Sequence, residues 1–188
     1  MLRFLPLLII ALMALPASAQ TLTVQEGSTL EIDGSSNKSD WTVKASSFAG
    51  TFEMAEGSVV SAEFVVDATT IKGESGVIQD RLITRALKTP ANPEIRFVLS
   101  EVAGSQAVDG GLLLATKGTL EIAGVEQEVE MDVLMAAVDG GVRFTGSQEV
   151  SMTDYRIQPP KAMFGALVVS KDVTVRFDVL AGGVPAGD

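Results

Sequence analysis

The sequence contains no histidine and no cysteine. Without histidine, a Ser-His-Asp or Cys-His nucleophilic mechanism cannot be assembled. A metal site would have to use carboxylates alone, which favours calcium or magnesium. EF-hand spacing, a phosphate-binding glycine loop and a dinucleotide fingerprint are also missing from the sequence. We therefore expect a protein that is not an enzyme, requires no cofactor and binds no metal.

Basic residues and aromatic residues are both scarce. The chain has 14 Lys and Arg against 24 Asp and Glu, for a net charge of −10. This balance repels nucleic acids and anionic lipid headgroups, so we expect no nucleic-acid partner. Aromatic residues make up 5% of the chain. An interior built mostly from valine, alanine, leucine and methionine leaves unfilled volume more readily than one built from aromatic rings.

One long apolar run is present, and it lies at the N-terminus. Arg3 precedes the apolar segment 5–15, and the small residues of segment 17–19 follow it. This order predicts a secretory signal peptide over residues 1–19. The run is too short, and interrupted too closely by prolines, for a membrane span. We expect no transmembrane segment after signal removal and a periplasmic or secreted protein.

Most of the remaining chain alternates between apolar and polar residues, as half-buried β-strands do. The clearest case is the segment 126–138. One side of it carries Val129, Met131, Val133 and Met135. The other side carries Glu128, Glu130 and Asp132. Glycine-containing turns separate about eight such segments, which favours an antiparallel barrel or sandwich.

The periodicity changes to that of a helix over residues about 76–88. Apolar residues recur at helical spacing there, and Pro90 and Pro93 end the segment. A single amphipathic helix needs an apolar surface to cover, and the open end of a barrel provides one. We therefore predict an all-β fold: one antiparallel barrel of about eight strands with one capping helix. We expect a single domain at residues 20–180 and a flexible tail at 181–188.

Several short motifs occur in a fixed order along the chain. They are GSSNKSDW at residues 34–41, RALK at 85–88 with NPEIRF at 92–97, TLEIAGV at 119–125, and MTDYRIQPP at 152–160 followed by Phe164-Gly165. Together they resemble the YceI-like family of polyisoprenoid-binding or lipid-binding periplasmic domains. The sequence departs from that pattern at Ser39, where histidine is common in one branch of the family.

This resemblance implies a lipocalin-like barrel with a helix over one end and no catalytic machinery. It further implies a long apolar lumen that holds an isoprenoid lipid, a quinone or a fatty-acid-like chain. The apolar lipid would be the partner of the protein, for transport, storage or sensing. Since each buried CH₂ group contributes roughly 0.8 kcal/mol, a long chain would bind without polar contacts.

The predicted lumen is formed by the inward-facing apolar residues of the strands. We expect the ligand to contact Trp41, Phe48, Phe52, Phe64, Phe97, Leu112, Leu114, Met131, Val133, Met135, Phe144, Met152 and Phe177. The same residues could equally fill an ordinary packed core. In that case the protein would be a non-catalytic envelope interaction or stress module. An exposed strand or the helix edge could also pair two copies, so a homodimer is one candidate assembly.

Four polar residues are candidates for the rim of the lumen, where a lipid head group would lie. Asp154 and Tyr155 belong to one turn, and Arg81 and Arg85 lie on the predicted helix. The simpler interpretation of Asp154 and Tyr155 is a structural turn, in which the carboxylate accepts backbone hydrogen bonds and the ring packs. The simpler interpretation of the two arginines is the solvated face of an amphipathic helix.

Overall fold

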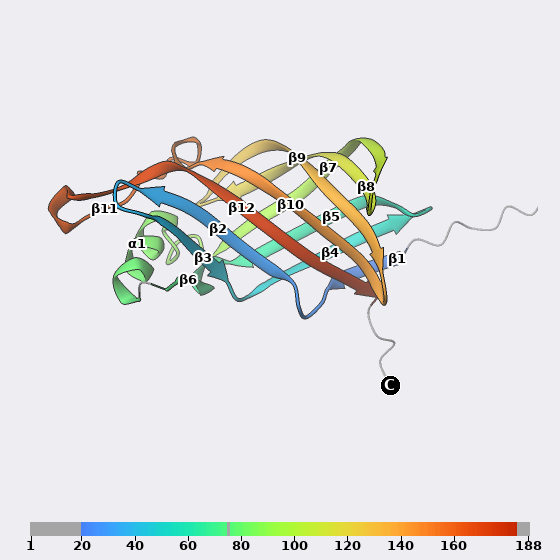
Figure 1. Cartoon of the computed structure of the whole chain (residues 1–188), viewed down its shortest axis with the longest axis horizontal. Coiled ribbons are helices and arrows are strands. Elements are labelled where there is room, and N and C mark those ends of the chain that lie inside the picture. The colour runs from blue at the N-terminus through green and yellow to red at the C-terminus, as the bar shows by residue number, and fades with distance from the viewer. Residues whose placement is uncertain (1–19, 75, 184–188) are drawn as a thin grey trace, which may run out of the picture.

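Hairpins carry the chain back and forth across one continuous antiparallel sheet, which curls into an elongated barrel (Figure 1). The computed structural model describes residues 20–74 and 76–183, so the predicted signal peptide and residues 184–188 lie outside it. The elements in chain order are β1 (Gln20–Val24), β2 (Thr29–Ser36), β3 (Asp40–Ala45), β4 (Phe48–Ala55), β5 (Ser58–Asp67), η1 (Ala68–Thr70), β6 (Ile71–Gly73), α1 (Val77–Leu87), β7 (Glu94–Val108), β8 (Gly111–Ile122), β9 (Val125–Val138), β10 (Gly141–Ser151), η2 (Met152–Tyr155), β11 (Lys161–Ala162), η3 (Met163–Gly165) and β12 (Leu167–Gly183).

Two bent strands close the barrel. β1 and β2 follow one another as two halves of one strand, and β3 and β4 do the same; β1 pairs with β4 while β2 pairs with β3. The bend after β1 is held by Ser28, whose hydroxyl donates to Gln25 O at 2.7 Å and accepts from Leu180 N at 3.0 Å. β12 pairs with β10 on one edge and with β1 and β2 on the other. The predicted antiparallel barrel of eight strands with one helix is thus confirmed.

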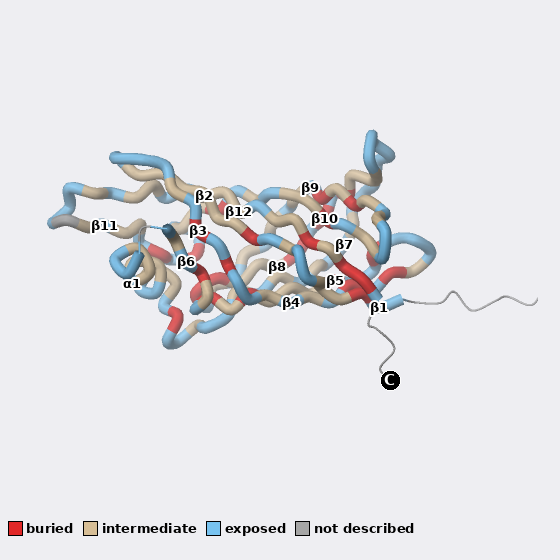
Figure 2. Tube along the Cα trace, turned by 60° about the horizontal axis from the view of Figure 1, so that its bottom comes forward, coloured by how far each residue is buried: buried red, intermediate tan, exposed pale blue. Residues whose placement is uncertain are grey.

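β12 extends further than the sequence predicted. The flexible tail was expected from residue 181, but the strand continues to Gly183, and Ala181 is fully buried. The reason is the pairing with β1, in which Val24 faces Ala181 and Leu22 faces Gly183. Figure 2 shows this buried part of β12 in red beside β1.

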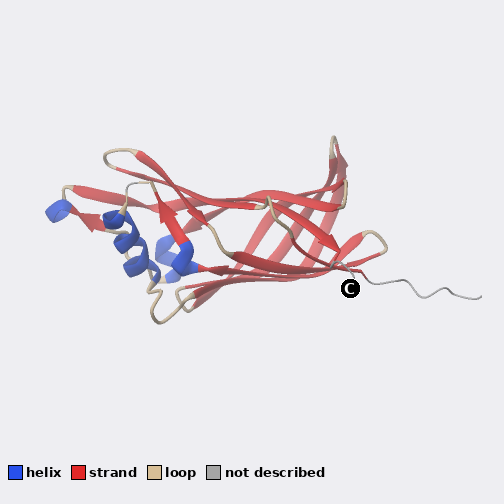
Figure 3. Ribbon diagram, turned by 90° about the horizontal axis from the view of Figure 1, so that it is seen from below, coloured by secondary structure: helices blue, strands red, loops and turns tan. Residues whose placement is uncertain are grey.

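The predicted helix lies at one end of the barrel, beside β6 and the β11 hairpin (Figures 1 and 3). It ends at Lys88, which adopts the left-handed conformation with φ 54° and closes the last turn by donating its backbone N–H to Thr84 O. Within residues 20–74 and 76–183, no helix has the length and apolar character that crossing a bilayer requires.

The interior contains three clusters of buried residues. The largest lies at the end opposite the helix, which we call the packed end, and is built around Leu22, Met54, Met135, Val179 and Ala181. A second cluster lies between the helix and strands β2, β3, β5 and β6, and a third joins the η2 segment to Ala86 and Leu87 at the C-terminal end of the helix. Between these clusters the barrel is hollow.

Candidate ligand-binding cavity

A cavity of about 630 Å³ occupies the barrel between the packed end and α1. Volumes of roughly 300–1,000 Å³ are typical of sites that enclose a small organic ligand. The wall is formed by inward-facing residues of the barrel strands, among them Phe97 and Leu99 on β7 and Val173 and Val175 on β12. These four side chains are half-buried although they face inward, because the cavity beside them is not filled by other side chains.

Two stacked phenylalanines mark the inner end of the cavity. Phe52 on β4 and Phe144 on β10 lie with ring centroids 4.7 Å apart and planes inclined by 14°. Both rings line the cavity and both belong to the packed cluster, so one side of the stack meets the void and the other meets the core. This stack separates the hollow part of the barrel from the packed end.

The helix forms the roof of the cavity. Its inner face carries Leu82, Ile83, Ala86 and Leu87, all of which line the cavity. None of the helix residues is buried, although four apolar side chains face inward. A helix over a solid core would bury such a stripe, whereas this one faces open space.

The cavity opens beside the N-terminal end of α1; we call this opening, lined by Ser36, Ser39 and Ile78, the mouth. Ile78 lines the cavity and is nevertheless 72% exposed, which places it at the boundary with solvent. The β2–β3 turn on the other side is tied to the β11–β12 hairpin through Asn37. Its Nδ2 donates to Ala166 O, and its Oδ1 accepts from Val168 N, both at 3.0 Å.

The lining is almost entirely apolar. The polar residues among it are Ser36, Ser39, Gln79, Thr116 and Gln148, and no lining residue is ionisable. Thr116 is already satisfied, because its hydroxyl donates to Met131 O at 2.8 Å. Since Ser36, Ser39 and Gln79 lie near the mouth, the deep part of the cavity offers few polar contacts. Such a surface favours an alkyl or isoprenoid chain over a polar guest.

Glycines on the inner wall let the aromatic rings that line the cavity lie close to the sheet. Each lies against one ring: Gly34 against Trp41, Gly50 against Phe64, Gly118 against Phe97 and Gly146 against Phe177. A Cβ atom at Gly34 would lie 2.2 Å from the Trp41 ring, which real side chains do not tolerate. The missing side chain therefore lets the indole lie against β2 at Gly34, which is in register with Trp41. The space that a tilted ring would occupy belongs to the cavity instead.

The structure places most of the predicted lumen residues on the cavity wall. Those lining it are Trp41, Phe52, Phe64, Phe97, Leu114, Met131, Val133, Phe144, Met152 and Phe177. Phe48, Leu112 and Met135 face inward but do not line it. Phe48 packs on the Phe64 ring at a centroid distance of 5.5 Å. Leu112 and Met135 belong to the packed end, because β8 and β9 extend beyond the Phe52–Phe144 stack.

None of the four predicted rim residues lines the cavity. Tyr155 is buried in the third cluster with Ile157 and Val150, and burial raises its pKa to about 12. Asp154 is exposed, and its backbone carbonyl accepts from Gln127 Nε2 at 2.9 Å. Arg81 and Arg85 lie on the outer face of α1, because helical periodicity turns them away from the apolar stripe. The ring of Tyr155 thus packs as the turn interpretation predicts, and the two arginines lie on the solvated face, whereas Asp154 accepts its hydrogen bond through the backbone carbonyl instead of the carboxylate.

Sequence reasoning missed two parts of the site. The first is the lining contributed by α1: a capping helix is predicted, but Leu82, Ile83, Ala86 and Leu87 are not among the predicted lumen residues. The second is the set of inner-wall glycines, which the alternation pattern treats as gaps. Each glycine occupies an inward position of its strand and lies opposite or diagonal to an aromatic residue, a relation that appears only once strand pairing is known.

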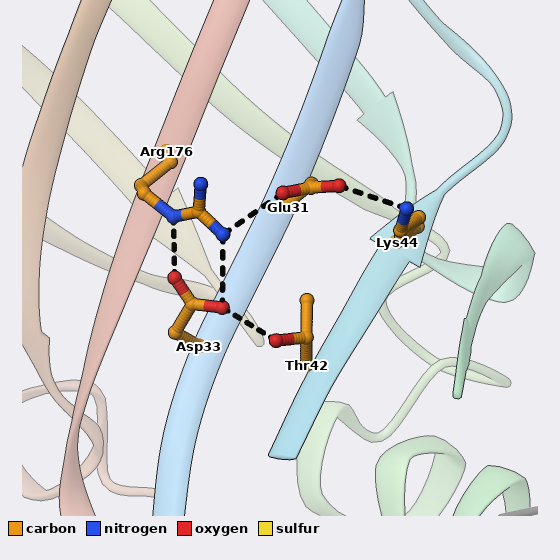
Figure 4. A network of polar contacts seen from close by, with 5 residues as sticks. All are labelled: Glu31, Asp33, Thr42, Lys44 and Arg176. Carbon is orange, nitrogen blue, oxygen red and sulfur yellow. Dashed lines mark hydrogen bonds and ion pairs between the residues drawn. The ribbon is translucent and has the colours of Figure 1, made fainter. Parts of the chain in front are cut away.

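Outside the cavity, an ion-pair network joins β12, β2 and β3 (Figure 4). Arg176 Nη2 lies 2.9 Å from Glu31 Oε2, and its Nε and Nη2 both donate to Asp33. Lys44 Nζ lies 2.9 Å from Glu31 Oε1, and Thr42 Oγ1 donates to Asp33 at 2.6 Å. The Arg176 hydrogen bond, reinforced by Thr42, holds the pKa of Asp33 below its ordinary value. The network belongs to the outer wall and leaves the lumen uncharged.

Solved structures share this architecture at low sequence identity. BcnA from Burkholderia cenocepacia matches with a TM-score of 0.69 and 15% identity, over 83% of this chain and 98% of that one. A polyisoprenoid binding domain from Saccharophagus degradans matches with a TM-score of 0.69 and 13% identity, over 89% and 100%. The YceI protein of Campylobacter jejuni matches with a TM-score of 0.60 and 13% identity, over 76% and 84%. These likenesses establish the fold.

The sequence itself assigns the family. None of the curated proteins compared with this chain matches it. The sequence profile of the YceI-like domain, in contrast, matches residues 24–181, which run from the end of β1 through the helix to nearly the end of β12. The chain therefore belongs to the YceI-like domain family.

Proposed function

We propose that this protein is a non-catalytic carrier that holds the apolar chain of an isoprenoid or fatty-acid-like lipid inside the barrel. The observation that carries the proposal is the cavity of about 630 Å³ with an almost wholly apolar lining. A void lined by apolar side chains forfeits van der Waals contacts on its open side. A lipid chain restores those contacts and leaves water, at roughly 0.8 kcal/mol per buried CH₂ group.

The shape of the site suggests how the ligand lies. The chain would enter at the mouth and extend toward the Phe52–Phe144 stack, which limits how deep it can reach. Its head group would remain near Ser36, Ser39 and Gln79, where the polar lining is concentrated. A quinone or polyprenyl head suits this arrangement, since neither needs a charged partner within the lumen.

The relationship to known proteins supports the isoprenoid class. The chain shares its family with YceI-like domains, and the similar domain from Saccharophagus degradans is described as polyisoprenoid binding. We extend that ligand class to this protein and expect transport, storage or sensing of the lipid outside the cytoplasm. The signal peptide predicted over residues 1–19 supports export to the periplasm or beyond.

A catalytic role receives no support from the cavity. General acid–base chemistry needs an ionisable group within hydrogen-bond reach of the reacting atoms, and the residues lining this cavity include none. The carboxylates Glu128 and Glu130 lie exposed on the outer face of β9, away from the lumen. No cluster of carboxylates within the described residues is suited to hold a metal ion.

The proposal is tested by organic extraction of the protein purified from its own envelope, followed by mass identification of the extract. We expect an isoprenoid or fatty-acid-like lipid from the wild type and none from Leu114→Trp, since Leu114 is buried on the cavity wall. The matched control is Ala115→Trp, one residue along β8 and exposed on the outer face. This control should retain the lipid.

Trp41 gives an independent measurement in solution. It is the only tryptophan of the chain and it lines the cavity. Titration with a water-dispersed quinone or polyprenyl phosphate should therefore change its fluorescence with saturation. A protein that yields no lipid on extraction and shows no saturable change would contradict the carrier and favour the alternative of an envelope interaction module.

A further inference from the structure

Positive charge is distributed unevenly over this acidic protein. Of the Lys and Arg residues in the described part of the chain, seven form ion pairs: Lys44, Lys72, Arg96, Lys117, Arg143, Lys171 and Arg176. The other six have no carboxylate within ion-pair distance among the described residues and are all exposed: Lys38, Arg81, Arg85, Lys88, Arg156 and Lys161.

These six unpaired cations lie on the segments that surround the mouth and the roof. Lys38 occupies the β2–β3 turn, and Lys161 lies in β11, whose hairpin is bonded to that turn through Asn37. Three more lie on α1 or cap it, and Arg156 follows η2. The cations along the rest of the barrel wall are neutralised by their partners. Within residues 20–74 and 76–183, unpaired positive charge is therefore confined to the helix end.

The turns at the packed end have the opposite character. The three hairpin turns there and the bend between β1 and β2 each carry one exposed carboxylate and no basic residue. The four residues are Glu26, Glu56, Asp109 and Asp139. The two ends therefore differ in charge: the turns of the packed end carry carboxylates alone, whereas the helix end carries the six unpaired cations together with exposed carboxylates such as Asp40 and Asp154.

Exposed apolar side chains gather at the same end as the unpaired cations. Phe164, at the tip of the β11–β12 hairpin, is fully exposed, and that hairpin projects beyond α1 (Figures 1 and 3). Val77 and Ile78 at the start of α1 are 65% and 72% exposed. Exposed apolar residues rimmed by basic ones are the composition of surfaces that bind the interface of an anionic membrane.

We propose that the mouth end of the protein docks onto an anionic lipid bilayer, with Phe164, Val77 and Ile78 entering the interface and the unpaired cations contacting headgroups. The inference rests on the proposed function, because it names the surface from which the cavity would take up or release its lipid. Docking in this orientation brings the mouth against the bilayer, so the apolar chain need not cross water.

The net charge of −10 by itself opposes this partner. Salt screening decides whether repulsion by the net charge or attraction by the nearby cations is stronger, since charges separated by more than about 10 Å interact weakly at ordinary salt. In the docked orientation the acidic turns of the packed end lie at the far end of a long barrel, while the cations lie at the surface. The cations at the mouth then act on the headgroups more strongly than the distant carboxylates of the packed end do.

Vesicle flotation tests the proposal. The protein is expressed as the full chain, purified in its processed form, and mixed with vesicles of equal parts phosphatidylcholine and phosphatidylglycerol or of phosphatidylcholine alone. We expect flotation with the anionic vesicles only, and weaker flotation as salt rises. Phe164→Ser should lower the partition coefficient about tenfold or more through loss of ring burial. Lys38→Gln with Lys161→Gln should lower it by roughly twenty- to thirtyfold, about fivefold for each charge.

Matched controls separate the mouth from the rest of the surface. Lys117→Gln with Arg143→Gln removes the same charge from the barrel wall, and Val60→Ser removes a wall side chain that is 59% exposed. Both should float like the wild type. Absence of wild-type flotation, equal binding to neutral vesicles, or equal losses in mouth and wall variants would each overturn the proposal.

Two other outcomes remain distinguishable. Dimers that disappear in Phe164→Ser, without any vesicle binding, would assign the mouth end to a second copy of the chain and overturn membrane docking. Lipid extraction and the Trp41 titration need no vesicles. Flotation without lipid in the cavity would therefore contradict the carrier alone, and a loaded cavity without flotation would contradict the docking alone.

Discussion

The two ends of the barrel are built from the same alternating strands, yet one is solid and the other is hollow. At the packed end, the inward residues include Leu22, Met54 and Met135, whose side chains meet across the lumen and fill it. Toward α1, inward aromatic rings lie flat over glycines, and Phe97 and Phe177 leave the axis open. The comparison shows that alternation sets which side chains face inward, while the residue opposite decides how much space they fill.

The stability cost of truncating a phenylalanine should differ most between the two regions. Phe144→Ala removes a buried ring from the stack at the packed end and should cost about 3–5 kcal/mol of unfolding free energy. Phe97→Ala removes a half-buried ring that already faces the cavity, and should cost about 1–2 kcal/mol. Urea unfolding of the lipid-free protein measures both. Equal losses would show that the hollow half is packed in solution.

A methyl group at Gly34 should close part of the hollow half. Gly34→Ala forces the Trp41 ring toward the lumen, so we expect a loss of about 1–3 kcal/mol and a reduced lipid capacity. Trp41 emission reports the displaced ring directly. Gly104→Ala is the control, because a Cβ atom there meets nothing within 4 Å. Unchanged emission and capacity in Gly34→Ala would contradict the role assigned to the inner-wall glycines.

Tyr155 tests how the helix end tolerates a buried polar group. Its hydroxyl is buried and has no hydrogen-bond partner among the described residues, so Tyr155→Phe should stabilise the protein by about 1 kcal/mol. Because burial raises the folded-state pKa to about 12, above the unfolded value of roughly 10, the wild type keeps its full stability below pH 10. It should lose stability as the pH rises through 12.

Two measurements check this difference. Tyr155 is the only tyrosine of the chain, so tyrosinate absorbance titrates it alone. The gap between wild type and Tyr155→Phe in chemical unfolding should widen above pH 10. A tyrosinate transition at the ordinary pKa, or a destabilised phenylalanine variant, would mean that the hydroxyl has a partner in solution.

The smallest effect is expected on the outer wall. Asp33→Asn weakens the network with Arg176 and should lower stability slightly at neutral pH, since exposed ion pairs contribute little. The pKa of Asp33 is lowered in the fold, so its contribution is present above the unfolded value of about 4 and is lost as pH falls through the folded value. Thermal unfolding across this range should show the two proteins converge in acid and in high salt. A constant difference would point to a packing effect instead.

Much of this architecture follows from local pattern. The alternation over residues 126–138 appears as β9, and the helical spacing over residues 76–88 appears as α1. Ten of the thirteen predicted lumen residues line the cavity. Leu112 and Met135 have the same inward periodicity and do not. Their position along the barrel depends on strand register, which pairs Leu112 with Met135 and Met135 with Phe144, next to the packed cluster.

Local sequence determined the two faces of each strand, the single amphipathic helix and the family, because periodicity and short motifs act between near neighbours in the chain. Tertiary structure alone decided that the lumen is hollow, that Tyr155 is buried and that unpaired cations gather at the mouth. These properties depend on residues brought together from distant segments. Gly146 on β10 contacts Phe177 on the neighbouring strand β12, and Arg176 on β12 contacts Glu31 on the neighbouring strand β2. The unfilled volume of the lumen and the pairing of charges both depend on such long-range contacts, so no single stretch of the sequence specifies them.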